Sequence, residues 1–160
     1  MKPASKKWFA SAWFVGAAVA AAVALAFVGF TPNKEMSALP QVVVYKSPTC
    51  SCCNKWVRHL RDNGFQVQPY NRQDMAVVKR EVGVPDGLTS CHTAKVGKYI
   101  VEGHVPADLI SKMLRERPDI AGLSVPGMPM GSPGMEGPVR DRYSVIAFGD
   151  NGSKSVYAQR

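Results

Sequence analysis

The sequence predicts one α/β domain built on a single mixed sheet, preceded by an apolar segment and completed by a C-terminal β-hairpin. Short runs that are rich in β-branched residues, or in which apolar and polar residues alternate, are typical of strands. Along the chain they are separated by segments with helical periodicity. With 160 residues, 46% hydrophobic and 20% charged, the chain has material for one ordinary core. This size excludes two independent cores, and the composition excludes a wholly disordered chain.

The N-terminal segment predicts export. Residues 8–30 form a run of 23 residues without a charge, and three lysines precede it. A helix of this length reaches about 34 Å, enough to cross a bilayer, and the positive flank predicts that the later residues leave the cytoplasm. The small-x-small stretch 24–26 is typical of a processing site. We therefore expect residues 1–30 to be either a membrane anchor or a cleaved signal peptide.

Residues 31–40 are polar, carry two prolines and show no periodicity, which predicts a linker before a domain at 41–160. The domain opens with a β-branched run at 41–46 that ends at a Ser-Pro pair, as a buried strand would. A helix is expected at 50–63, because Trp56, Val57 and Leu60 share one face and Gly64 can take the left-handed conformation that ends a helix.

The next elements repeat this alternation. Residues 65–70 alternate apolar and polar, and Pro69 restricts that strand to an edge or an end. Asp74 can cap a short helix at 75–82. After a Pro-Asp-Gly turn, strands are expected at 89–96 and 98–102, and Pro106 then opens a helix at 107–115 that has an apolar face.

The C-terminal third contains a long loop and a hairpin. Residues 122–138 hold nine Gly or Pro in seventeen positions, which predicts a loop without helix or central strand. Runs at 142–148 and 153–158 flank a Gly-Asp-Asn-Gly turn, a pattern that favours a β-hairpin.

A cysteine cluster stands where the first strand passes into the first helix. Cys50, Cys52 and Cys53 form a C-x-x-C that overlaps a C-x-C. The free amides and dipole of a helix N-terminus favour thiolate over thiol. A C-x-x-C after a first strand is the thioredoxin arrangement and can close a reducible disulfide. Three thiolates on one turn instead suit Cu(I), a soft ion of low coordination number.

The third cysteine favours metal over disulfide exchange, which needs only two. Adjacent Cys52 and Cys53 cannot easily pair with each other, so a purely structural pair of disulfides fits poorly. Redox chemistry without metal stays an alternative. Zinc is the second choice of metal, because it has a lower preference for thioether ligands and no redox chemistry of its own.

Further ligand candidates lie later in the chain. Cys91 and His92 are adjacent on the predicted third strand, whose preceding loop faces the C-x-x-C turn in a thioredoxin-like sheet. His104 follows the next strand and could supply an imidazole from the same rim. His59, in the first helix, is expected to face solvent.

Three methionines, Met128, Met130 and Met135, occupy the Gly/Pro loop. Thioethers bind Cu(I) without deprotonation, and methionines in an exposed loop have no core-packing role. They are therefore candidate ligands, and a simple flexible lid is the alternative.

Taken together, these motifs resemble the CopG-type periplasmic copper-resistance proteins. The likeness spans roughly residues 41–136. The segments that carry it are YKSPTCSCCNKW (45–56), HL (59–60), GF (64–65), SCHTA (90–94), YIVEGHVP (99–106), GMP (127–129) and GSPGME (131–136).

The resemblance implies a thioredoxin-like fold, copper held by the cysteine cluster, and interconversion of Cu(I) and Cu(II) in periplasmic copper tolerance. It also implies His92 or His104 and a loop methionine in the coordination shell. The copper ligands that it implies are Cys50, Cys52, Cys53 and Cys91.

We therefore expect an exported copper protein that binds more than one copper ion. Cys50 and Cys53 are its candidate catalytic pair, because their thiols could supply the electrons; alternatively the bound copper cycles and an outside partner supplies or removes them. A periplasmic thiol-disulfide oxidoreductase and a non-catalytic copper store or chaperone are the alternatives. The expected partners are copper ions, other periplasmic copper or redox proteins and, if the segment is uncleaved, the inner membrane. Nucleic acid is not expected, because the basic residues are scattered without interleaved aromatics.

Overall fold

The computed structural model describes residues 39–160. The expected anchor or signal segment and nearly all of the expected linker lie outside the described residues, so both stay predictions. Within 39–160, no helix has the length and apolar character needed to cross a bilayer.

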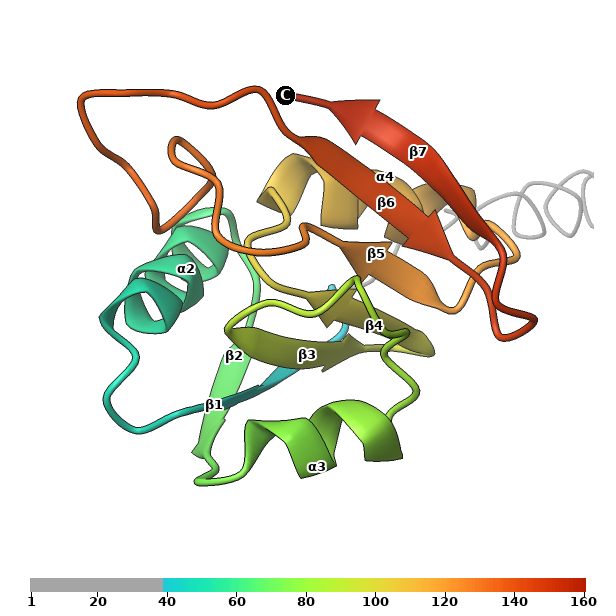
Figure 1. The fold of residues 1–160 in the computed structure, drawn as a ribbon, viewed down its shortest axis with the longest axis horizontal. Helices are drawn as coiled ribbons and strands as arrows, with labels where there is room; N and C mark the ends of the chain where they lie inside the picture. The colour runs from blue at the N-terminus through green and yellow to red at the C-terminus, as the bar shows by residue number, and fades with distance from the viewer. Residues whose placement is uncertain (1–38) are drawn as a thin grey trace, which may run out of the picture. The chain divides into compact units, whose positions relative to one another are not determined.

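The described chain forms a mixed α/β structure with a seven-stranded sheet (Figure 1). Its strands are β1 (Val42–Lys46), β2 (Val67–Asn71), β3 (His92–Val96), β4 (Tyr99–Glu102), β5 (Gly122–Ser124), β6 (Ser144–Phe148) and β7 (Lys154–Gln159). Its helices are α2 (Ser51–Asp62), α3 (Met75–Glu81) and α4 (Ala107–Glu116). The predicted alternation of strands and helices, with a hairpin at the C-terminal end, is confirmed.

The strands lie in the order β2-β1-β3-β4-β5-β6-β7. β1 runs parallel to β2 and antiparallel to β3, and β4 runs antiparallel to β3 and parallel to β5. The β6–β7 hairpin extends the sheet from β5. β2 is an edge strand, as Pro69 predicts, because proline has no N–H to donate to a ladder and is tolerated where one side of the strand has no partner.

Helices α2 and α4 pack against one face of the sheet. Trp56 and Leu60 of α2 and Ile110 of α4 share a core with Ala94 of β3 and Val101 of β4, and all five are fully buried. Neighbouring residues in a strand point to opposite faces. Thr93 and Glu102, which adjoin these core residues in β3 and β4, therefore belong to the other face, where α3 packs.

The expectation that residues 122–138 contain no central strand is wrong for its first residues. Gly122–Ser124 form β5, paired on both sides with β4 and β6. Gly122 is what permits this pairing, because a Cβ atom there would collide with the carbonyl of Ile100. Leu123 is fully buried in the core. A glycine can thus mark close backbone approach inside a sheet as well as a loop.

Candidate metal centre

The cysteine turn lies beside the start of β3 because of strand pairing. β1 and β3 are antiparallel, and Lys46 at the end of β1 pairs with His92 at the start of β3. The residues that follow Lys46 and the residues that precede His92 therefore meet at the same edge. This register brings Cys91 to the turn that carries Cys50 although 41 positions separate them in the chain.

Helix α2 begins immediately after Cys50, which serves as its N-cap. The Cys50 backbone is extended (φ −73°, ψ 98°), and the Cys53 amide donates to Cys50 Sγ at 3.3 Å. Three positions apart at the start of the helix, Cys50 and Cys53 have Cα atoms 5.3 Å apart, and their sulfurs form a disulfide in the structure. Cys52 and Cys91 are free thiols.

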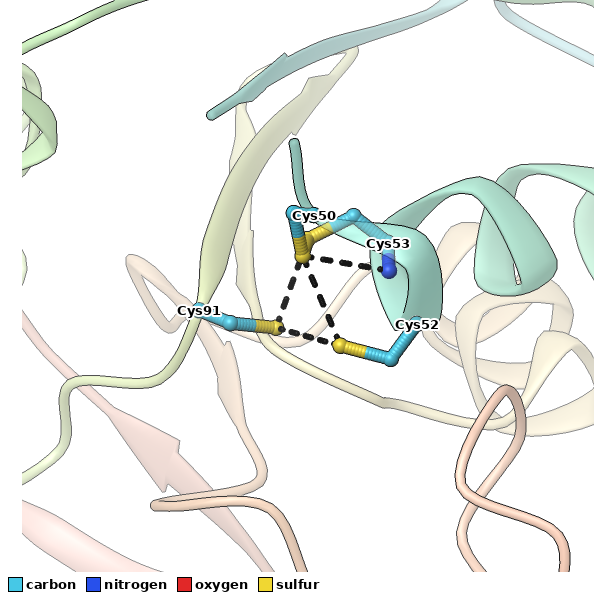
Figure 2. A group of neighbouring side chains, drawn as sticks. All are labelled: Cys50, Cys52, Cys53 and Cys91. Atoms are coloured by element: carbon cyan, nitrogen blue, oxygen red, sulfur yellow. Dashed lines mark hydrogen bonds between the residues drawn. A yellow bond between two sulfur atoms is a disulfide. The ribbon is translucent and has the colours of Figure 1, made fainter. Parts of the chain in front are cut away.

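All four sulfurs form one group, shown in Figure 2. Cys52 Sγ lies 3.4 Å from Cys50 Sγ and 3.9 Å from Cys91 Sγ. Cys91 Sγ also lies 3.5 Å from Cys53 Sγ. Cys91 points toward the helix from the opposite side of the group and so completes a set that α2 alone does not provide.

Cys91 is a weak acid in the metal-free protein. Burial, reinforced by the neighbouring Cys52, raises the pKa of the Cys91 thiol to about 12. A lowered thiol pKa is expected for the cysteines at the N-terminus of α2, because the helix N-terminus stabilises a thiolate. Cys91 lies outside that N-terminus, so this expectation does not extend to it. A bound cation would reverse this balance, since thiols deprotonate when they coordinate metal.

Two imidazoles contact the Cys91 sulfur from its other side. His92 Nδ1 lies 3.1 Å and His104 Nε2 lies 3.0 Å from Cys91 Sγ. His104 Nδ1 lies 2.8 Å from the carbonyl oxygen of Pro133, which can only accept, so Nδ1 carries the proton and Nε2 presents a lone pair toward Cys91. A carbonyl that orients a histidine in this way is typical of metal sites.

Both imidazoles favour the neutral form that binds metal. Burial lowers the pKa of His104, and burial lowers that of His92 further, with His104 and Lys79 adding to the effect. His92 is fully buried, its ring centroid is 4.3 Å from that of Trp56, and its Nε2 atom has no hydrogen-bond partner in the described structure.

His59 lies outside both groups of candidate ligands. It is half-buried, and its Nε2 accepts a hydrogen bond from the Ala107 amide at 3.1 Å. The expectation that it faces solvent is therefore only partly correct: its imidazole links α2 to the first turn of α4.

The methionine loop covers the outer side of the cluster. A hollow of about 300 Å³ is lined by Cys52 together with Met128, Met130 and Met135, and Glu136 forms part of its wall. The structure thus gathers the three predicted methionines beside one of the predicted cysteines.

Gly134 is a point of close approach between this loop and α2. A Cβ atom there would lie 2.7 Å from the Cys52 carbonyl oxygen and 3.0 Å from the Trp56 nitrogen. The Gly134 amide donates to Glu136 at 2.6 Å, and this hydrogen bond is the main cause of the lowered pKa of the Glu136 carboxyl. Sequence reasoning did not single out either residue, although a glycine inside a methionine-bearing loop was a signal for Gly134.

The ligand atoms fall into two sets that share Cys91. One set holds four sulfurs, and the other holds the Cys91 sulfur with the two imidazoles; within each set all atoms lie within 4.8 Å of one another. Sulfur donors suit Cu(I), and imidazole suits several transition metals, copper among them. With the Cys50–Cys53 disulfide closed, only the Cys52 and Cys91 sulfurs remain free to bind as thiolates.

Comparison with known proteins identifies a matching family and similar solved structures. A family described as "Protein of unknown function, DUF411" matches residues 88–135, the segment that carries Cys91, both imidazoles and the methionine loop. No curated protein matches the chain.

Two solved structures, copper resistance protein CopG in Form 2 and in Form 1, are each 46% identical to the chain. Each alignment covers 76% of this chain and 98% of the solved one, with TM-scores of 0.73 and 0.72. At this identity and coverage, the chain belongs to the CopG family of copper-resistance proteins.

Proposed function

We propose that this protein is an exported copper-binding protein that holds Cu(I) through Cys50, Cys52, Cys53 and Cys91 and interconverts Cu(I) and Cu(II) in copper tolerance. One observation carries the proposal: the Cys91 sulfur stands between three cysteine sulfurs and two neutral imidazoles. Four sulfurs and two nitrogens exceed what one ion of low coordination number requires, which supports more than one copper ion.

The proposed fold class is thioredoxin-like. The strand order β2-β1-β3-β4, with β3 antiparallel to its neighbours, supports it. The disulfide at the junction of β1 and α2 supports it as well.

The electrons for the redox step come either from an outside partner, with all four cysteines kept as Cu(I) ligands, or from Cys50 and Cys53, whose sulfurs then leave the Cu(I) shell as they oxidise. When these two thiolates form a disulfide, they release two electrons, which reduce two Cu(II) ions to two Cu(I) ions. Cys52 and Cys91 keep their thiols and retain sulfur donors for the product. His92 and His104 contribute nitrogen donors, which suit Cu(II).

The hollow lined by Met128, Met130 and Met135 is the proposed copper entrance. Its wall includes Cys52, so an ion held by thioethers would be next to a cluster sulfur. Thioethers remain available as ligands at any pH, since they carry no proton to lose.

The proposed location is the periplasm, reached through the apolar segment 8–30 as an inner-membrane anchor or a cleaved signal. Other periplasmic copper-handling or redox proteins would supply or remove copper and electrons.

A thiol-disulfide oxidoreductase is the second candidate, favoured by the Cys50–Cys53 disulfide at a helix N-terminus. To separate the two, the full-length chain is purified anaerobically and analysed for metals. Bound copper supports the copper protein. Copper near zero, together with rapid reduction of a protein disulfide, supports the oxidoreductase.

The redox step is then tested, as a single reduction event, by mixing the reduced metal-free chain with Cu(II) and a chromophoric Cu(I) chelator in a stopped-flow instrument. We expect Cu(I) to form faster than with free cysteine at the same thiol concentration. The matched control is the double variant Cys50→Ser with Cys53→Ser, in which the fast phase should disappear. If the wild type is no faster than free cysteine, the protein is a copper store or chaperone.

A further inference from the structure

A buried charged pair lies close to the cluster but belongs to neither set of candidate ligands. Glu102, at the end of β4, is fully buried, and its Oε1 lies 2.5 Å from the Nζ of Lys79 in α3. Thr93 of β3 donates to the other carboxylate oxygen at 2.6 Å and accepts from Lys79 at 3.0 Å. Burying two charges is costly, and such a pair is weak evidence for stability alone. Its position therefore needs another explanation.

The carboxylate also holds the residue that precedes Cys91. The Ser90 amide donates to Glu102 Oε1 at 2.6 Å. Cys91 itself lies before the first residue of β3, so no strand pairing holds it in place. A charge-assisted hydrogen bond is short and strong. This one fixes the backbone of the residue immediately before Cys91.

The same short segment holds the start of the methionine loop. The Ser90 hydroxyl donates to the Gly127 carbonyl, and the Gly127 amide donates to the Thr89 carbonyl at 3.1 Å. Gly103 lies against the Ser90 side chain, where any Cβ atom would collide with it. Ser90 is thus confined from both sides, and it connects the buried carboxylate to two parts of the proposed copper site.

We propose that Glu102 is a positioning residue: acting through the Ser90 amide, it holds Cys91 in the cluster and fixes the first hinge of the methionine loop. Lys79 neutralises the buried carboxylate, and Thr93 orients it. The inference rests on the proposed copper function. The positioning role requires only a hydrogen-bond acceptor at position 102, so the negative charge of Glu102 is itself dispensable.

Two double variants test this requirement. Lys79→Met with Glu102→Gln removes both charges but keeps an amide oxygen that can accept from the Ser90 amide. Lys79→Met with Glu102→Leu removes the charges and the acceptor. Neither leaves a buried charge unpaired, and apolar replacement of a buried ion pair is often neutral or stabilising. The two variants differ only at position 102, where the Gln pair keeps a side-chain amide that can bond both the Ser90 amide and the Thr93 hydroxyl, and the Leu pair keeps no polar group.

The first readout is Cu(I) affinity of the reduced full-length chain, measured anaerobically by competition with a chromophoric chelator. We expect the Gln pair to bind Cu(I) within about threefold of the wild type and the Leu pair to bind roughly 10- to 100-fold more weakly, the usual cost of losing a group that orients a ligand. Equal affinity in the two variants, whether both retained or both lost, would overturn the proposal.

The second readout needs no copper and separates failure of the proposal from failure of the proposed function. Alkylation of the Cys91 peptide in the reduced metal-free chain, followed by mass spectrometry, should be faster in the Leu pair than in the Gln pair. If the wild type binds no Cu(I), the copper function fails, but this comparison still decides the role of Glu102. Equal alkylation rates in the two variants would reject it.

A third measurement covers the case in which the Leu pair does not fold. In the wild type, the Ser90 amide should exchange its hydrogen at least roughly 100-fold more slowly than in an unstructured peptide, because its bond to Glu102 must open first. Exchange at the unprotected rate would show that the carboxylate does not hold Ser90.

Discussion

Replacing Gly134 with alanine tests whether the methionine loop rests tightly on the first turn of α2. Gly134 has a φ of +89°, a left-handed conformation that costs an alanine about 1–2 kcal/mol. The added Cβ would also lie 2.7 Å from the Cys52 carbonyl oxygen and 3.0 Å from the Trp56 nitrogen. These are backbone atoms of a helix, so the loop must move instead.

Forced displacement of this kind costs about 1–3 kcal/mol in a well-packed region. Together with the conformational cost, we expect Gly134→Ala to lower the free energy of unfolding by about 2–5 kcal/mol. Gly127→Ala is the matched control in the same loop: φ is +68° there, but a Cβ atom would meet nothing within 4 Å. It should cost only about 1–2 kcal/mol.

The assay is urea unfolding followed by far-ultraviolet circular dichroism, with all three proteins kept reduced so that the disulfide does not contribute. The informative quantity is the difference between the two variants, which isolates the contact with α2 from the backbone conformation. If the two variants differ by less than about 0.5 kcal/mol, the loop is not held against α2 and the hollow beside Cys52 is not a formed site.

Two further predictions concern acid stability and copper uptake. Burial holds the pKa of His59 below its ordinary value, although nearby carboxylates partly oppose this. The stabilisation that goes with the hydrogen bond from the Ala107 amide is therefore complete above about pH 6.5, the ordinary pKa, and declines as the pH falls from there toward the lowered pKa of the folded protein. His59→Gln keeps a hydrogen-bond acceptor but does not titrate, so the free energy of unfolding of this variant should decline less between pH 7.5 and 5 than that of the wild type. If the two proteins lose stability in parallel over this range, this account is contradicted. Changing Met128, Met130 and Met135 together to leucine keeps the apolar volume, and stopped-flow mixing with Cu(I) should show slower uptake with unchanged final stoichiometry. Unchanged uptake rates would mean that copper does not enter through the hollow.

Local sequence signals predicted most of the elements because each depends on neighbouring residues. The spacing of Trp56, Val57 and Leu60 predicted α2, and all three are buried against the sheet. Pro69 placed β2 at an edge, where it lies. The strand β5 was missed because a glycine such as Gly122 is typical both of a loop and of a strand whose backbone lies close to another. Only the pairing of Gly122 with Ile100 distinguishes the two cases.

The sequence by itself determined the chemistry available to this protein: three cysteine sulfurs at a strand-to-helix junction, a fourth cysteine beside a histidine, and methionines in a Gly/Pro loop. Tertiary structure decided the geometry. The pairing of Lys46 with His92 brings Cys91 to within 3.9 Å of Cys52, and no local pattern encodes that register.

Tertiary structure also decided the positions of the two residues that sequence reasoning missed. Glu102 acts on Ser90 across 12 positions, and Gly134 lies against a helix more than 70 positions earlier. Propensity and periodicity arise from contacts within a few residues, whereas these contacts exist only after strands distant in the chain have paired. Side chains without a motif can therefore be placed at the site only by the folded structure.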